Sequence, residues 1–448
     1  MKRWILLFLV TAVPAVLPLA FIDSLMHALT VSIAAVCLFL WITEAVPPFV
    51  PTLLLWVLVP ILLGRSDPAF SLQRVLSWAA DPVIALFFGG FVLGAAAERS
   101  GLARKLMGLA LRSAADSYRM LLLLVISVTA FLSMWMSNIA AAALVLACLH
   151  PVLANLDRED VLRKLLLVGV ALAADFGGMA TPIGTGPNAI AIASLSEARP
   201  ISFLAWMSFA LPLTVGMVGA SYFLLSRRIP RNANTRGIVS AGASPEESSE
   251  GIRGMFGRPF ILILAGAVLL WLTEPLHGVP ASVISLAAAA AVFVLGILKK
   301  DDLLKIDWST LLLIAGGITL GRLLEQTGVI KGLSDNVPFD SFDPTLSLFL
   351  LCLATALLSA LMSNTATAVL LIPLATALVP HPSTAILIAI AASLGVPLVI
   401  STPPNAMVFG EGGVRFGDLF WPGIILMVCG CLLISITGRP VLSLAGID

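Results

Sequence analysis

Charged residues are scarce in this chain. Asp, Glu, Lys and Arg together make up 11% of its 448 residues, whereas a soluble domain carries roughly 25%. Hydrophobic residues make up 59%, and the mean hydropathy is +1.05. This composition excludes an ordinary soluble protein and is typical of a polytopic α-helical membrane protein. The net charge of +1 also argues against a nucleic-acid partner.

Residues that usually carry enzyme or metal chemistry are also few. The five cysteines lie in apolar runs and form no CxxC pair, and the four histidines have no metal-binding spacing. The chain has no HExxH motif, no Walker loop and no recognisable Ser/His/Asp set. We therefore expect neither a disulfide framework nor a transition-metal site, and we do not expect an enzyme.

The apolar stretches predict about eleven transmembrane helices, the first within residues 1–26. Two longer runs, 119–154 and 346–379, could enter the membrane and return, and each is interrupted by a Ser-Asn pair. We interpret them as re-entrant hairpins, since non-helical backbone at membrane depth must be buried in protein or line a wet cavity. Proline and glycine interrupt two further runs, which predicts broken helices over 163–200 and 384–415.

The two halves of the chain repeat the same landmarks in the same order. Trp-x-Thr-Glu recurs at an offset of 230, Gly-Gly at 227, the hairpin Ser-Asn at 226 and the Pro-Asn of the helix break at 217. These offsets indicate a duplication, with repeat 1 at 27–228, a cytoplasmic linker at 229–257 and repeat 2 at 258–440. Each half has five spans and one hairpin, and an odd number of spans predicts inverted repeats, as in secondary transporters.

Positive charge is distributed unevenly across the predicted topology. With the N-terminus in the cytoplasm, twenty Lys and Arg residues lie in inside segments and six in outside segments. We therefore expect a multi-pass protein surrounded by membrane lipid, with a cytoplasmic N-terminus and a periplasmic C-terminus. Because no organelle or outer-membrane signal is evident, the expected location is a bacterial inner membrane.

Each half supplies the same polar groups. A hairpin tip carries Ser-x-x-x-Ser-Asn, with the two serines four residues apart and so on one helix face. Hydroxyl, amide and freed carbonyl oxygens form an uncharged all-oxygen environment, which suits Na⁺. A helix begins just after each break, and helix N-termini favour anions. The pattern predicts that Na⁺ and an anionic substrate bind together.

These motifs resemble the divalent anion/sodium symporter (DASS) family over nearly the whole chain. The similarity rests on Ser363-Asn-Thr365, Thr402-Pro-Pro-Asn-Ala-Met-Val408, Gly184-Thr185 with Pro187-Asn188, and the Trp-x-Thr-Glu motifs. It implies scaffold and transport domains, a homodimer, and transport of dicarboxylates, tricarboxylates or sulfate by Na⁺ symport or by exchange.

The resemblance also implies roles for individual residues. The candidate substrate-binding residues at the two tips and the two breaks are Ser137, Asn138, Ile139, Ser363, Asn364, Thr365, Thr185, Asn188, Thr402 and Asn405. One candidate Na⁺ site comprises Ser133, Ser137, Asn138 and Gly184, and the other comprises Ser359, Ser363, Asn364 and Ser401. Na⁺ at two sites is the only cofactor expected.

Three residues depart from the family pattern. Ile139 stands where the family has threonine, which favours a smaller, asymmetric or partly apolar anion. Gly186 replaces a proline, and we expect it to loosen the first break. Asp175 lies in the first broken helix, and an offset of 217 aligns it with Ala392. An intramembrane carboxylate could tune Na⁺ binding, carry a proton or neutralise a substrate cation, or it could pair with a nearby arginine.

The sequence therefore predicts an all-α polytopic Na⁺-coupled symporter that imports a small divalent anion, a di- or tricarboxylate, by an elevator-type motion. The alternatives are a carrier of sulfate or another anion, an anion exchanger, an H⁺-coupled carrier and, less favoured, an anion channel.

Overall fold

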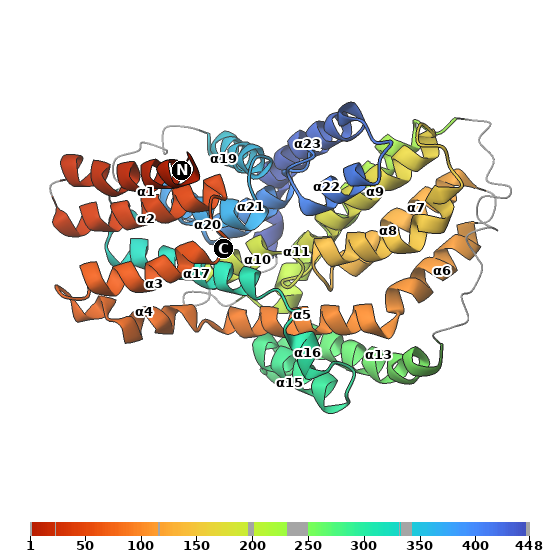
Figure 1. Cartoon of the computed structure of the whole chain (residues 1–448), viewed down its shortest axis with the longest axis horizontal. Helices are drawn as coiled ribbons and strands as arrows, with labels where there is room; N and C mark the ends of the chain where they lie inside the picture. Colours follow the sequence, from red (N-terminus) through yellow and green to blue (C-terminus); the bar gives the residue numbers. More distant parts are fainter. Residues whose placement is uncertain are drawn as a thin grey trace.

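The described part of the chain is helical and contains no strand (Figure 1). The computed structural model describes residues 2–22, 24–114, 117–195, 201–230, 250–330, 332 and 343–444. The first-half elements are α1 Lys2–Phe21, α2 Leu25–Thr43, α3 Val50–Leu62, η1 Pro68–Phe70, α4 Leu72–Ala79, α5 Pro82–Ser100, α6 Leu102–Ala114, α7 Tyr118–Ser133, α8 Asn138–Ala154, α9 Val161–Gly177, η2 Gly178–Ala180, α10 Gly186–Leu195 and α11 Phe203–Ser226. The second-half elements are α13 Glu250–Leu272, α14 Glu274–His277, α15 Ala281–Val294, α16 Lys300–Leu303, α17 Trp308–Gln326, α19 Pro344–Ser359, α20 Asn364–Leu378, α21 Pro382–Ser393, α22 Pro403–Gly410 and α23 Phe416–Leu444.

The apolar helices differ in length. Within the described residues, α2, α5, α11 and α23 are long and apolar enough to cross a membrane, and nine further apolar helical segments span 10 to 17 residues each. The number of about eleven spans stays a prediction. Hydropathy does not detect where a helix ends: α15 stops at Val294, just before Gly296 adopts a φ of +67°. The prediction of an all-α polytopic membrane protein is confirmed.

The two interrupted runs fold as helix pairs. Residues 119–154 correspond to α7 and α8, which pack together, and residues 346–379 correspond to α19 and α20, which also pack together. In the first broken run, α9 and η2 precede α10, and in the second α21 precedes α22. Each chain interruption therefore coincides with a Ser-Asn pair or with a Pro- and Gly-rich string.

The predicted linker over 229–257 is shorter in the structure. Its residues 231–249 lie outside the described part, but α13 begins at Glu250, so residues 250–257 are helical. The hydrophobic signal begins only near residue 258, whereas the helix extends a further two turns into polar sequence.

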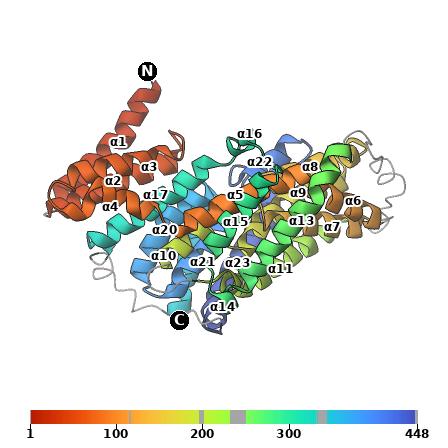
Figure 2. The ribbon, with the colours of Figure 1, turned by 90° about the horizontal axis from the view of Figure 1, so that it is seen from below.

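The two halves interlock. The molecule is elongated, with α1–α4 at one end and α6 and α7 near the other (Figures 1 and 2). The second-half helix α17 packs on α3 and α4, and the second-half helices α13 and α15 pack on α5. Each peripheral cluster thus combines helices from both halves.

The repeated Gly-Gly pairs are sites of close packing between helices. A Cβ added at Gly89 in α5 would lie 2.5 Å from the Ser285 carbonyl oxygen of α15, and Gly316 in α17 similarly lies against Thr52 of α3. The second glycine of each pair faces the central elements, since Gly90 contacts Ile183 and Gly317 in α17 contacts Val369. Both pairs let a long helix approach neighbours on two sides.

Candidate functional site

The first hairpin tip is held by its own serines. Ser137 caps α8 by accepting a hydrogen bond from the Ala140 amide at 3.3 Å. Ser133, at the end of α7, donates to Asn138 Oδ1 at 2.9 Å and lies 2.5 Å from the Ala174 carbonyl oxygen of α9. The tip is therefore fixed both to itself and to the broken helix behind it.

The second tip repeats this arrangement. Ser363 caps α20 through the Ala366 amide at 3.2 Å, and Ser359 Oγ lies 2.7 Å from Asn364 Oδ1 and 2.5 Å from the Ala392 carbonyl oxygen. The prediction that the two serines share one helix face is wrong, because Ser133 and Ser359 end the incoming helices whereas Ser137 and Ser363 are the N-caps of the next helices. In each half the first serine still reaches the tip asparagine.

The asparagines of the two breaks also have matching partners. Asn188 Nδ2 donates to the carbonyls of Gly178 and Thr181, at 3.1 and 2.8 Å. Asn405 Nδ2 donates to the carbonyls of Val396 and Leu398, at 3.0 and 2.9 Å. Both amide Oδ1 atoms are buried without a hydrogen-bond partner among the described residues. These side chains close the loops and leave two buried acceptors available.

Oxygen atoms from the first tip and the first break converge at Gly178. A Cβ at this glycine would lie against Asn138 Oδ1 and 3.1 Å from the Gly184 carbonyl oxygen. Three of the predicted first-site Na⁺ residues, Ser133, Asn138 and Gly184, are thereby brought together. Only a residue without a side chain fits between these oxygens.

The predicted second Na⁺ set is only partly assembled. Ser359 and Asn364 are paired, and Ser363 lies at the same tip. Ser401 Oγ instead accepts a hydrogen bond from the Leu398 amide within its own loop, at 2.9 Å. The two halves thus share the arrangement at the tip but differ at the break.

Each hairpin tip meets the break of the opposite half. A Cβ at Gly186, the first residue of α10, would collide with the side chain of Thr365 at the start of α20. Gly186 therefore makes room for Thr365, which corrects the expectation that it loosens the loop. Thr185 is half-buried beside it, and Ile139, the counterpart of Thr365, is 46% exposed on the first turn of α8.

Asp175 connects the first hairpin tip to the break of the second half. It is fully buried in α9, its Oδ2 accepts a hydrogen bond from the Thr402 hydroxyl at 2.8 Å, and its Oδ1 lies 3.5 Å from Asn138 Nδ2. Thr402 itself caps α22. The ion pairs found among the described residues do not include Asp175, so the alternative of an arginine partner is not supported.

The packing also corrects the alignment of Asp175 with Ala392. Ser133 reaches the Ala174 carbonyl where Ser359 reaches that of Ala392, which is an offset of 218. Gly177 and Gly395 pack against the same positions of α7 and α19. The counterpart of Asp175 is therefore Ser393. The offset between the halves is 218 before the breaks and 217 at the Pro-Asn pairs, so the first break is one residue longer than the second. An alignment on the Pro-Asn pairs alone does not show this difference.

An aromatic stack that the sequence reasoning missed lies beside the first tip. Trp135, within the tip, stacks on Phe203 of α11 and Trp271 of α13, with ring centroids 6.4 and 6.3 Å away. Phe203 and Trp271 are 4.7 Å apart, and Trp271 is fully buried. The repeated Trp-x-Thr-Glu motif was the one signal that marked Trp271.

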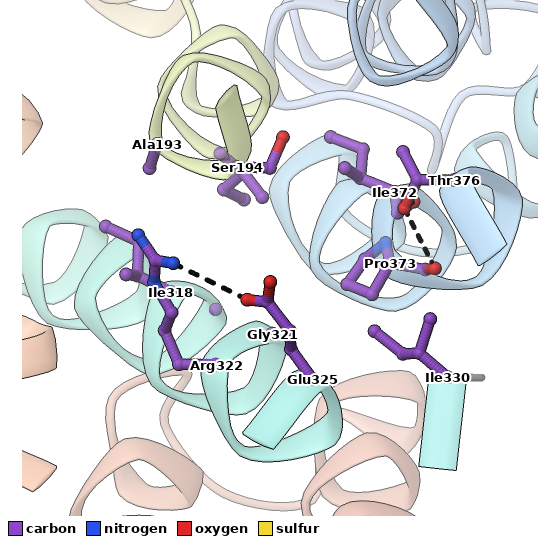
Figure 3. A pocket seen from close by; sticks show the side chains of 12 residues that line it. Ala193, Ser194, Ile318, Gly321, Arg322, Glu325, Ile330, Ile372, Pro373 and Thr376 are labelled. Carbon is purple, nitrogen blue, oxygen red and sulfur yellow. Dashed lines mark hydrogen bonds and ion pairs between the residues drawn. The ribbon is translucent and has the colours of Figure 1, made fainter. Parts of the chain in front are cut away.

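A cavity of about 190 Å³ lies farther along α10 and α20, against α17 (Figure 3). Arg322 and Glu325 of α17 form an ion pair of 3.4 Å at its wall, and Thr376 of α20 lies opposite. None of the predicted substrate or Na⁺ residues lines this cavity. From the sequence, Arg322 is only one of the six Lys and Arg residues that the predicted topology places in outside segments.

Comparison with known proteins gives one family match. The family model described as citrate transporter (CitMHS) matches residues 38–385 and 342–446. An uncharacterized transporter of Haemophilus influenzae is 31% identical over 422 residues, which cover 89% of this chain and 88% of that protein. These matches span both halves of the chain.

Two further relatives carry names that state a substrate. The sodium-dependent dicarboxylate transporter SdcS of Staphylococcus aureus is 26% identical over 88% of this chain and 82% of its own length. The inorganic phosphate transporter PHO87 of Saccharomyces cerevisiae is 29% identical over 75% of this chain and 37% of its own length. The solved YdaH transporter of Alcanivorax borkumensis has the same fold, with a TM-score of 0.58, 16% identity, and coverage of 88% of this chain and 100% of that chain.

Proposed function

Because this chain belongs to the citrate transporter family, we propose that it is a secondary-active Na⁺ symporter that imports a small divalent anion, a di- or tricarboxylate. It is a membrane transporter and not an enzyme. The observation that carries the finer proposal is the pair of Ser-Asn tips, each held by the same hydrogen bonds to a broken helix.

The cation part of the proposal rests on the oxygen atoms around Gly178. Ser133, Asn138 and Gly184 contribute a hydroxyl, an amide and a carbonyl oxygen there, and hard cations prefer oxygen ligands. Ser137 completes the first proposed set, and Ser359, Ser363, Asn364 and Ser401 form the second. Within the described residues, no group of three or more His, Cys, Asp and Glu side chains could hold a metal ion.

The anion part of the proposal rests on four helix N-termini. Those of α8 and α22 are joined through Asp175, and those of α10 and α20 meet at Gly186 and Thr365. Amide groups at helix N-termini attract anions. The substrate would therefore contact the tip residues Ser137, Asn138, Ser363, Asn364 and Thr365, with Thr185, Asn188, Thr402 and Asn405 behind them.

The proposed transport cycle is an elevator-type motion in a homodimer. The tips and broken helices would move together, because hydrogen bonds tie them to each other, while the peripheral helices would serve as the scaffold. The bacterial inner membrane, the cytoplasmic N-terminus and the periplasmic C-terminus remain part of this proposal, supported by the distribution of Lys and Arg.

Transport of an inorganic anion is the second candidate. The relative PHO87 is named a phosphate transporter, and Ile139 replaces at one tip the hydroxyl that Thr365 supplies at the other. A site with fewer donors suits a smaller anion. Exchange and H⁺ coupling stay open as alternative modes of coupling.

Uptake into proteoliposomes tests the proposal. Labelled succinate is offered with and without an inward Na⁺ gradient, and citrate, sulfate and phosphate are added as competitors. We expect Na⁺-dependent succinate uptake that citrate inhibits. Uptake of phosphate or sulfate in preference to succinate would favour the second candidate, and uptake indifferent to Na⁺ would overturn Na⁺ symport.

A further inference from the structure

The buried carboxylate of Asp175 makes the two candidate cation sites unequal. One of its oxygens faces Asn138 of the first tip, and the other accepts the Thr402 hydroxyl from the second half. Its counterpart Ser393 is equally buried, and the Ser393 hydroxyl has no hydrogen-bond partner among the described residues. The first site therefore has a formal negative charge beside it and the second does not.

Two neutral hydrogen-bond donors do not compensate a buried carboxylate. Transfer of an ionised group out of water is costly unless the group is paired or binds a metal. The ion pairs of the described residues leave Asp175 out, and the side chains that face it are an amide and a hydroxyl. A bound cation beside Asn138 would supply the missing positive charge.

We propose that Asp175 is a direct ligand of the cation at the first site, and that this site consequently binds Na⁺ more tightly than the second and fills first. The inference rests on the proposed Na⁺ symport. Ser133, Asn138 and Gly184 supply neutral oxygens, and Asp175 supplies the charge. A carboxylate oxygen is the hard ligand that such a cation favours.

The hydrogen bond from Thr402 to Asp175 links the first cation site to the second half of the chain. Thr402 caps α22, because its hydroxyl oxygen accepts a hydrogen bond from the Asn405 backbone amide. The same hydroxyl donates to Asp175 and so connects Asp175 to the second break. A cation at the first site draws Asp175 toward the first tip and fixes the orientation of Thr402. It also neutralises a negative charge that would otherwise repel the incoming anion.

Thermal unfolding of the purified full-length protein in detergent tests this with Na⁺ alone as the probe. NaCl is titrated against choline chloride at constant ionic strength, and the half-saturating Na⁺ concentration for stabilisation is measured. Asp175→Ser, which copies Ser393, should raise that concentration at least tenfold. Asp302→Asn, which removes a carboxylate that contacts Lys299, Arg99 and Lys305 and none of the candidate site residues, should leave it within twofold of wild type.

A reciprocal variant keeps the test decisive if Asp175→Ser does not fold. Ser393→Asp places the charge at the second site and should lower the half-saturating Na⁺ concentration at least fivefold. If Asp175→Ser folds and keeps the wild-type value, or if Ser393→Asp leaves it unchanged, the role of Asp175 is overturned while Na⁺ symport stands. If the wild-type protein shows no response to Na⁺, both proposals fall.

Discussion

At the residue scale, the site depends on a few side chains that hold backbone breaks in place. In each half, one serine at the end of the incoming hairpin helix approaches both the tip asparagine and a carbonyl of the broken helix. Four contacts of this kind fix the geometry of both tips. The oxygen atoms of both tips are therefore preorganised.

Removing these serines should loosen the tips. We expect Ser133→Ala and Ser359→Ala each to lower the free energy of unfolding by about 1–2 kcal/mol, because a buried carbonyl and an amide oxygen lose a donor. Thermal unfolding measures this. Ser208→Ala is the control, since Ser208 is exposed and bonds only within its own helix. Equal small effects in all three variants would contradict the structural role.

A pH effect is expected at Asp302, in the short helix α16 that precedes α17. A hydrogen bond from the Lys299 amide, and then the positive charges of Arg99 and Lys305, lower the pKa of this carboxyl from its ordinary value. A lowered folded-state pKa gives stability that is present above the unfolded pKa, near about 3.9, and is lost as pH falls through the folded pKa.

We therefore expect Asp302→Asn to be less stable than wild type at neutral pH, by at most about 1 kcal/mol because Arg99 and Lys305 are solvent-accessible. The difference should shrink as the pH is lowered below 4. Unfolding midpoints of the two proteins measured across this range check it. A difference that is constant with pH would show that the charge of Asp302 does not contribute.

At the element scale, the sequence predicted where helices are interrupted better than how long they are. Ser-Asn, Pro-Asn and Gly-Gly strings mark real features, since turn chemistry and helix breaking are local. Helix length depends on where capping succeeds, as at Gly296 after α15, and on polar turns that hydropathy misses, as at Glu250. For that reason the sequence places the interruptions of the helices more precisely than their ends.

The close contact of α5 with α15 should tolerate no side chain at Gly89. The new methyl group of Gly89→Ala would meet the Ser285 backbone, and we expect a loss of about 1–3 kcal/mol in stability from overpacking. Gly108→Ala is the matched control, because nothing lies within 4 Å of the added Cβ and alanine favours a helix. Thermal unfolding measures both variants. An unfolding midpoint for Gly89→Ala as high as that for Gly108→Ala would contradict the close contact at Gly89.

At the scale of the whole molecule, function depends on contacts between the halves. Asp175 and Thr402 are 227 residues apart, and Gly186 meets Thr365, which is 179 residues away in the sequence. The duplication predicted matching tips within each half. It could not predict that each tip lies beside the break of the other half, because a repeat shows which positions are equivalent and not which positions are in contact. Inversion of the repeats and their division into domains remain predictions.

Arg163 at the start of α9 makes a further link between the halves. Its buried guanidinium donates to the Leu153 carbonyl at 2.6 Å and to the Glu411 carbonyl, at the end of α22, at 2.9 Å. We expect Arg163→Ala to cost about 2 kcal/mol or more, since carbonyls lose charge-assisted hydrogen bonds. Arg163→Lys should recover only part of this, because lysine lacks the planar fork. Full recovery in the unfolding midpoint would contradict the geometry.

We infer that the two Ser-Asn tips together bind Na⁺ and the anion. The most direct measurement is Na⁺-gradient-driven uptake of labelled succinate into proteoliposomes by the wild type, Asn138→Ala, Asn364→Ala and the control Ser208→Ala. We expect uptake by the wild type and by the control. Each asparagine variant should remain folded but lose uptake. Unimpaired Na⁺-dependent uptake by either asparagine variant would contradict the paired site.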